Sequence, residues 1–250
     1  MEIKTVWAVY FSGTGTTEKV VTAVAKTMAG QLGAAEKKFC FNLPKDREDE
    51  LSFGPEDLVV MGVPVYAGRV PNLLLPYIRD KVKGNGALAV PVVLYGNRNF
   101  DDGLMELRNV MNDNGFHPVA GGAFVGEHSF SKILGAGRPD AEDMALVEEL
   151  AQKAAQKVKE LAQAPQQPVE VEGCDPIRPY YTPRDRHGEP IKDFFEGQAQ
   201  DRPRQVRQVR PVCPAVPHGL HRPRGRVQCS GQVHQVLRLR EEVSHGGQVF

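Results

Sequence analysis

The stretch Val6-Trp7-Ala8-Val9-Tyr10-Phe11, followed by Ser12-Gly13-Thr14-Gly15-Thr16-Thr17, decides the fold of this chain. The first six residues form an apolar run that predicts a buried strand, and a helical pattern starts near Glu18. The free N–H groups and positive dipole end of a helix's first turn attract a phosphate group. The two glycines allow close backbone approach, and the hydroxyls add donors. We therefore predict phosphate binding by Ser12, Gly13, Thr14, Gly15, Thr16 and Thr17.

The residues that this loop lacks narrow the kind of ligand. It has no Lys or Arg, whereas an ATP-binding loop ends in Gly-Lys-Ser/Thr. It also lacks the third glycine of a dinucleotide fingerprint. An anion would thus be held by neutral donors, and a small phosphate monoester fits better than a triphosphate or a dinucleotide. The alternative is an ordinary Gly-Thr turn between strand and helix.

The chain up to residue 164 alternates strand and helix patterns. Short apolar runs predict five strands, at Val6–Phe11, Phe39–Leu43, Leu58–Val65, Ala87–Tyr95 and Gly122–Val125. Apolar residues at helical spacing predict helices at Glu18–Gln31, Pro71–Lys83, Asp101–Asn114 and Asp140–Ala164. This alternation predicts an α/β fold with a doubly wound, five-stranded parallel sheet.

Two further loops are expected beside the Ser12–Thr17 loop, because ligands of such sheets bind beyond the carboxyl ends of the strands. Both offer an aromatic side chain and a glycine, which suits a flat aromatic ligand. The alternative for each tyrosine is packing at a strand end. The candidate residues are Pro64, Tyr66, Ala67 and Gly68 in one loop, and Tyr95, Gly96, Asn97, Arg98, Phe100 and Asp101 in the other.

The pattern S-x-T-G-x-T after the first strand resembles the phosphate loop of flavodoxins, and the resemblance covers roughly residues 1–164. It implies a flavodoxin-like fold in which the first loop holds the phosphate of FMN. It also implies that the loops around Tyr66 and Tyr95 flank the isoalloxazine ring. His128, after the last strand, is interpreted as a surface histidine, with an approach to the ring as the alternative.

The strings GVPVYAGRVP, LYGNRNFDD and GEHSFS resemble the flavodoxin-like half of ferrodoxins, fusion proteins in which a two-cluster ferredoxin domain follows. The segment Ile177–Gly188, IRPYYTPRDRHG, resembles the connector of those proteins. Its prolines and charged residues are equally consistent with an extended arm on the surface. We therefore divide the chain into a domain at 1–164, a connector at 165–195 and a tail at 196–250.

Charge separates this tail from the rest of the chain. Residues 1–195 hold 13 Lys and 9 Arg against 27 Asp and Glu, a net of about −5, whereas residues 196–250 hold 9 Arg, no Lys and 4 acids. The tail has no Ile, Tyr, Thr, Met or Lys, so it cannot bury a conventional core, and this favours disorder. The alternative is an Arg-rich tail that binds RNA or another acidic partner, but Phe250 is its only aromatic residue, which disfavours base stacking.

The spacing of aliphatic residues in the tail indicates a reading-frame slip. Val206, Val209, Val212 and Val216 have the cysteine spacing of a [4Fe–4S] run, C-x-x-C-x-x-C-x-x-x-C-P. The same spacing recurs at Val233, Val236, Leu239 and Val243. Codons GTG and CTG contain TG, so a cysteine codon lies one base later wherever the next codon begins with C or T. All eight positions meet this condition.

The shifted frame yields two complete cluster motifs. Codons chosen for Val206–Pro217 read as CDKCGLCAQLCP from the second base, and those for Val233–His245 read as CIKCCGCVKKCPT. The two frames join near Phe194-Phe195, whose codons contain a run of T bases in which one surplus T suffices. We interpret residues 196–250 as an out-of-frame ferredoxin region. In the printed frame no metal site is expected, and two [4Fe–4S] clusters are expected in the corrected frame alone.

The sequence thus predicts an electron-transfer flavoprotein that carries FMN, with no catalytic residues of its own, and an electron carrier is favoured over a substrate-specific enzyme. The rivals are an NAD(P)H-dependent flavin or quinone reductase and a flavodoxin-fold binding module without a cofactor. We expect redox partner proteins, and neither nucleic acid nor a membrane. The absence of a signal or a spanning segment, and four scattered cysteines, favour the cytoplasm. The oligomeric state stays open.

Overall fold

The computed structural model describes residues 1–131 and 133–190, so the predictions made for the tail and for the frame junction at Phe194-Phe195 lie outside it. Residues Met1–Tyr181 belong to one compact unit. Residues 182–190 belong to a second unit, in which Arg184 and Pro190 form an antiparallel bridge. The sheet, its covering helices and the loops at the carboxyl ends of the strands all belong to the first unit.

The main sheet has the strand order β2-β1-β4-β6, with β7 and β8 both pairing with β6 beyond it. All its ladders are parallel. The strands are β1 (Thr5–Tyr10), β2 (Ala35–Cys40), β4 (Asp57–Pro64), β6 (Leu88–Tyr95), β7 (His117–Pro118) and β8 (Gly122–Val125). With β7 and β8 counted as one broken strand, this is the 2-1-3-4-5 order of doubly wound sheets. The predicted fold class is confirmed.

The fifth strand is broken beside Pro91 of β6. Ala89 pairs with Pro118 and Val92 with Gly122, so the register shifts by one residue between the two ladders. Pro91 lies in this gap and has no N–H group to donate to a neighbouring strand. The chain therefore divides into β7 and β8 where one strand was expected.

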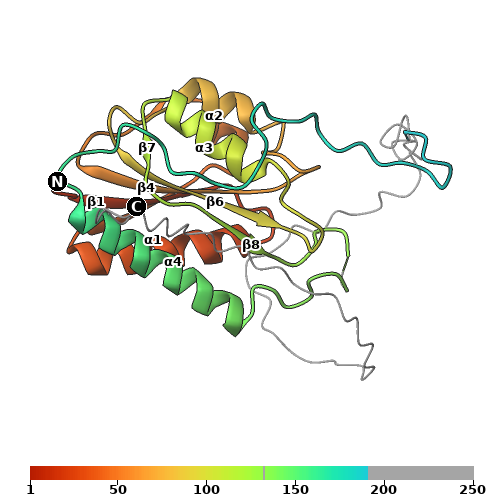
Figure 1. Cartoon of the computed structure of the whole chain (residues 1–250), viewed down its shortest axis with the longest axis horizontal. Helices are drawn as coiled ribbons and strands as arrows, with labels where there is room; N and C mark the ends of the chain where they lie inside the picture. The colour runs from red at the N-terminus through yellow and green to blue at the C-terminus, as the bar shows by residue number, and fades with distance from the viewer. Residues whose placement is uncertain (132, 191–250) are drawn as a thin grey trace, which may run out of the picture. The chain divides into compact units, whose positions relative to one another are not determined.

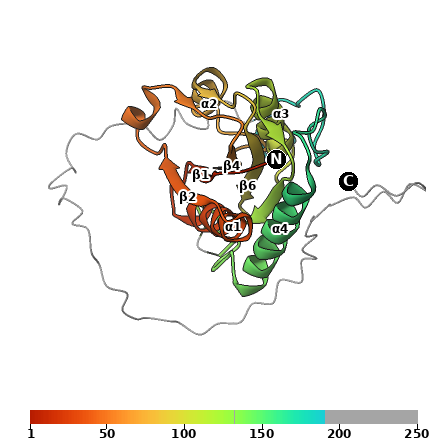
Figure 2. The ribbon, with the colours of Figure 1, turned by 90° about the vertical axis from the view of Figure 1, so that its left-hand side faces the viewer.

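Two helices cover each face of the sheet (Figures 1 and 2). Helices α1 (Thr16–Leu32) and α4 (Ala141–Glu160) pack on one face, and α2 (Leu75–Lys81) and α3 (Gly103–Asp113) on the other. Because both faces are covered, the inner strands β4 and β6 are buried along almost their whole length. This burial explains their unbroken apolar sequences.

Three predicted elements had wrong boundaries. Only the first two residues of Phe39–Leu43 lie in β2, which begins at Ala35; it is an edge strand whose first four residues are exposed, so they carry no apolar signal. The predicted helix at Pro71–Lys83 begins only at Leu75. Its last two residues form β5 (Val82–Lys83), which pairs with β3 (Leu51–Ser52) in a small second sheet. The predicted helix at Asp140–Ala164 ends at Glu160.

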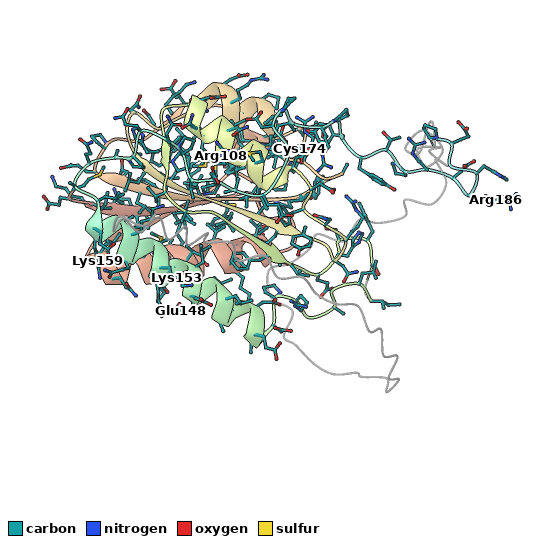
Figure 3. All side chains as sticks on the ribbon, viewed as in Figure 1. Arg108, Glu148, Lys153, Lys159, Cys174 and Arg186 are labelled. Atoms are coloured by element: carbon teal, nitrogen blue, oxygen red, sulfur yellow. The ribbon has the colours of Figure 1, made fainter. Side chains whose placement is uncertain are left out.

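The start of α4 agrees with its sequence. Asp140 caps the helix by accepting hydrogen bonds from the backbone N–H groups of Glu142 and Asp143. The Asp143 side chain in turn accepts from the backbone of Asp140, which completes a capping box. Glu148, Lys153 and Lys159 of α4 are exposed (Figure 3), and Glu148 accepts a hydrogen bond from the Thr27 hydroxyl of α1. Among the described residues, no helix combines the length and the apolar character needed to cross a membrane.

Candidate functional site

Four loops gather at the carboxyl edge of the sheet, since they follow the parallel strands β1, β4, β6 and β8 (Figure 1). Strand β1 lies between β2 and β4, which is the point where the strand order reverses. Open α/β sheets bind their ligands at such a point, because the loops on its two sides separate and leave a crevice.

The loop after β1 presents unused backbone donors. Gly15 has a φ of 86°, a left-handed conformation that turns the chain into α1. Among the described residues, none accepts a hydrogen bond from the backbone N–H groups of residues 13–17. The first N–H groups with a partner are those of Glu18, which donates to Ser12 Oγ at 3.1 Å, and Lys19, which donates to the Gly15 carbonyl at 3.0 Å. Free amides of this kind attract an anion.

The loop is held in place by hydrogen bonds to Asn42. The Ser12 N–H donates to Asn42 Oδ1 at 2.7 Å, and Asn42 Nδ2 donates to the Ser12 carbonyl at 2.8 Å. Ser12 and Thr17 are buried. Their side chains therefore support the loop, whereas Thr14 and Thr16 lie on its open side with hydroxyl oxygens 3.3 Å apart.

A cavity of about 460 Å³ opens beside Thr14, Gly15 and Thr16. Its opposite wall is the loop after β8. The volume falls within the usual range for small-molecule sites. The complete lining is Thr14, Gly15, Thr16, Lys19, Glu127, His128, Ser129, Gly137, Arg138 and Pro139.

The sequence of the loop predicted that an anion would meet neutral donors, but the cavity beside the loop is also lined by cationic side chains. Lys19, one turn into α1, lines the cavity and donates to the Pro139 carbonyl at 2.8 Å. Arg138 lines it too and forms an ion pair with Asp143, whose hydrogen bond raises the pKa of the guanidinium. Two cationic side chains therefore line the cavity wall, and each of them already interacts with an oxygen atom of the protein.

The loop after β4 forms a tight turn. The backbone groups of Tyr66 and Arg69 bond to each other in both directions, at 2.9 and 3.1 Å. Ala67 and Gly68 between them have φ values of 50° and 81°, as in a type I′ turn. Tyr66 is 45% exposed, and partial burial raises its pKa, so the phenol is neutral at neutral pH.

The loop after β6 is more deeply packed. The Tyr95 and Phe100 rings lie 5.5 Å apart, and Phe100 is part of the buried core on the α3 side. Burial raises the pKa of Tyr95 as well. Asn97 and Asp101 have positive φ values, and Arg98 forms an ion pair with Asp101. Of the predicted residues here, Phe100 is placed to support the loop rather than to face a ligand.

Contacts join the loops after β4, β6 and β8 around the carboxyl edge. A Cβ built on Gly96 would lie 2.8 Å from the His128 ring, so that residue of the cavity wall rests on the loop after β6. The Asp102 N–H donates to the Gly68 carbonyl at 3.0 Å, which ties the loop after β6 to the turn after β4. Tyr66 and Tyr95 do not themselves line the cavity.

Sequence reasoning missed most of the wall formed by the loop after β8. Of that loop only His128 was considered, and chiefly as a surface residue. A signal existed, because Glu127 to Ser129 follow a predicted strand and must therefore lie at the same edge as the other loops. No such signal marks Arg138 and Pro139, which reach the cavity only because the loop folds back on itself through a hydrogen bond from the Glu127 N–H to the Arg138 carbonyl.

The parallel sheet, its strand order and the loops at its reversal point define the flavodoxin-like class of doubly wound α/β folds. Solved structures similar to this chain include a flavodoxin from Archaea (14% identity, 63% of this chain and 99% of that chain, TM-score 0.44). Others are an NADH:FMN oxidoreductase in its apo form (14%, 61% and 89%, 0.44) and rubredoxin oxygen:oxidoreductase from Desulfovibrio gigas (15%, 63% and 37%, 0.43). No protein-family model and no curated protein matches the sequence.

Proposed function

We propose that residues 1–164 bind FMN and that the protein transfers electrons through it. The observation that carries this proposal is the set of free N–H groups at residues 13–17, which open onto a cavity between Thr16 and the loop after β8. These backbone N–H donors suit a phosphate monoester, because several of them point at one small site and they carry no net charge. Lys19 and Arg138 in the wall supply the remaining charge compensation.

The chain's own residues then have distinct roles. Thr14 and Thr16 donate to the phosphate, while Ser12 and Asn42 hold the loop that carries them. Tyr66 and Tyr95, both neutral phenols, supply aromatic faces for the ring, and Gly68 lets the turn backbone approach its edge. When bound, the flavin supplies one-electron and two-electron transfer, and the protein supplies position and polarity.

The first test is a titration of the full chain with FMN, monitored by quenching of flavin fluorescence. Thr14→Val and Thr16→Val each remove a hydroxyl donor to a charged group, worth about 1.5–3 kcal/mol. We therefore expect each change to weaken FMN binding by roughly 10- to 100-fold. Thr22→Val is the matched control, since that hydroxyl bonds to the Glu18 carbonyl within α1 and does not line the cavity.

Two outcomes would contradict the assignment: much tighter binding of FAD or NAD than of FMN, or full affinity in the Thr14→Val, Thr16→Val double variant. Oxidation of NADH by the FMN-loaded protein without any partner protein would favour the reductase over the electron carrier. A chain that stays colourless with added FMN would favour a binding module without a cofactor.

We further propose that the protein is the flavodoxin-like part of a fusion with a ferredoxin domain. A frame slip near Phe194-Phe195 would then have replaced the sequence of the iron–sulfur half by an out-of-frame translation. The support is the double recurrence of the cluster spacing at Val206–Val216 and Val233–Val243, with Pro217 following the first run. Electrons would pass between the flavin and two clusters, and from there to redox partner proteins.

A further inference from the structure

The segment from Cys174 to Tyr181 binds to the N-terminal end of α3, far from it in sequence. Four hydrogen bonds run from this segment to the carboxylate of Asp102, the N-cap residue of α3. The donors are the backbone N–H groups of Cys174 and Arg178, at 2.9 Å each, and the Arg178 guanidinium, through Nε at 2.9 Å and Nη2 at 2.7 Å. Asp102 is only 1% exposed. Figure 3 shows Cys174 close to this end of α3.

Asp102 also holds the turn after β4. Its backbone N–H donates to the Gly68 carbonyl at 3.0 Å. Asp102 therefore bonds to the segment through its side chain and to the turn through its backbone. The turn and the loop after β6 are closely packed here, because a Cβ built on Gly68 would lie 2.5 Å from Asp101 Oδ2. A shift of Asp102 would therefore move the turn.

Two tyrosines extend the contact to both loops. The Tyr180 hydroxyl donates to the Val70 carbonyl at 2.8 Å, and the Arg69 guanidinium lies 4.3 Å from the centre of its ring. The Tyr181 N–H donates to the Ala67 carbonyl at 2.8 Å, and the Arg98 guanidinium lies 4.7 Å from its ring. Tyr181 thus bridges the turn after β4 and the loop after β6.

We propose that residues 174–181 are a clamp that holds the two ring-flanking loops in their binding conformation, with Arg178 as a positioning residue that acts through Asp102. This inference rests on the proposed function, since it takes a flat aromatic ring as the ligand of those loops. The clamp does not line the cavity beside Thr14 and Thr16. It therefore contributes to the affinity for the ring by ordering the loops in advance, and it leaves the phosphate site unchanged.

The test compares Arg178→Lys with the wild-type full chain. Lysine keeps the charge but loses the planar fork that bonds to Asp102 through two nitrogens. We expect affinity for FMN, and for riboflavin, which has no phosphate, to fall about tenfold, the effect of a modest loss of pre-organisation. Affinity for inorganic phosphate, measured by competition with FMN, should not change. Tyr180→Phe, which removes the bond to Val70, should act in the same direction.

Arg79→Lys is the control, because Arg79 is an exposed arginine on α2 that pairs with Asp80. Hydrogen exchange of the apo proteins is a second readout: the amides of Asp102 and Tyr181 should exchange faster in Arg178→Lys and at the wild-type rate in Arg79→Lys. Equal losses for FMN and inorganic phosphate, or unchanged affinity and exchange, would overturn the clamp. If the wild type binds no flavin, the proposed function fails, while the exchange rates still decide whether the clamp orders the loops.

Discussion

Among single residues, Asp102 is the one whose side chain links the segment 174–181 to the start of α3. Its carboxylate is buried and accepts four hydrogen bonds, three of them from Arg178, of which two come from the guanidinium. The hydrogen bond from the Arg178 side chain, reinforced by the backbone donors, holds the pKa of Asp102 well below its usual range. The ionised form is therefore stabilised in the folded protein.

This predicts how stability responds to acid. A depressed carboxyl pKa adds stability above the unfolded value of about 3.9, and that stability is lost as the pH falls towards the lower folded value. We expect Asp102→Asn to lower the free energy of unfolding at pH 7 by about 1.5–3 kcal/mol, because the amide group cannot accept all four bonds. Urea unfolding at several pH values measures both effects.

The difference between wild type and Asp102→Asn should shrink as the pH is lowered from 5 to 3, since wild-type Asp102 loses its advantage there. Asp80→Asn is the control, because its carboxylate is exposed and, within the described part of the chain, forms an ion pair with Arg79 alone. A difference that stays constant over this pH range would show that the charge of Asp102 does not contribute to stability.

At the scale of elements, α1 is pressed against β4 at Gly62. A Cβ built on Gly62 would lie 2.1 Å from Val21 Cγ2 and 3.1 Å from Thr17 Cγ2, both on α1. Thr17 belongs to the first turn of this helix, next to the free amides of the Ser12–Thr17 loop. The absence of a side chain at Gly62 thus sets how closely the helix, and with it the loop, approaches the sheet.

We expect Gly62→Ala to lower the free energy of unfolding by about 1–3 kcal/mol through overpacking. Val21→Ala should relieve the clash, so the double variant should lose less stability than the sum of the two single variants. Gly30→Ala, in the same helix with no atom within 4 Å of its built Cβ, should instead gain up to about 1 kcal/mol. Strictly additive losses in the double variant would mean that Val21 does not limit the approach.

At the scale of the whole molecule, the clamp lies at the end of the flavodoxin-like unit, whose described residues are Met1–Tyr181. The Tyr181 N–H bonds to the Ala67 carbonyl, so the last of these residues lies beside the turn that we assign to the flavin ring. The iron–sulfur region that we propose for the frame-corrected protein would follow this unit in the sequence.

Deletion of one T from the codons of Phe194-Phe195 should restore both cluster motifs. We expect the repaired chain to bind two [4Fe–4S] clusters, about eight iron atoms per chain, and to be brown after anaerobic reconstitution. The printed chain, treated in the same way, is the control and should bind none. Iron and sulfide analysis with electron paramagnetic resonance would check this, and a repaired chain that binds no iron would falsify the frame slip.

The sequence by itself determined the fold class and the first loop. Buried parallel strands must be apolar throughout, so β1, β4, β6 and β8 were found within a residue or two. The edge strand β2 was misplaced because its exposed first residues carry no apolar pattern. The strand-to-helix turn at Gly15 was predictable because it is a local feature of the chain, marked by an apolar run, two glycines and a helical pattern, whereas phosphate binding there stays a prediction.

Only the tertiary structure decided which distant residues complete the site. Lys19 and Arg138 reach the same cavity because the loop after β8 folds back against α1, and the hydrogen bond from Lys19 to the Pro139 carbonyl spans 120 residues. Arg178 meets Asp102 across 76 residues, through a segment without regular structure. Such pairings depend on the path of irregular chain over a finished sheet, and irregular chain leaves no periodic pattern in the sequence.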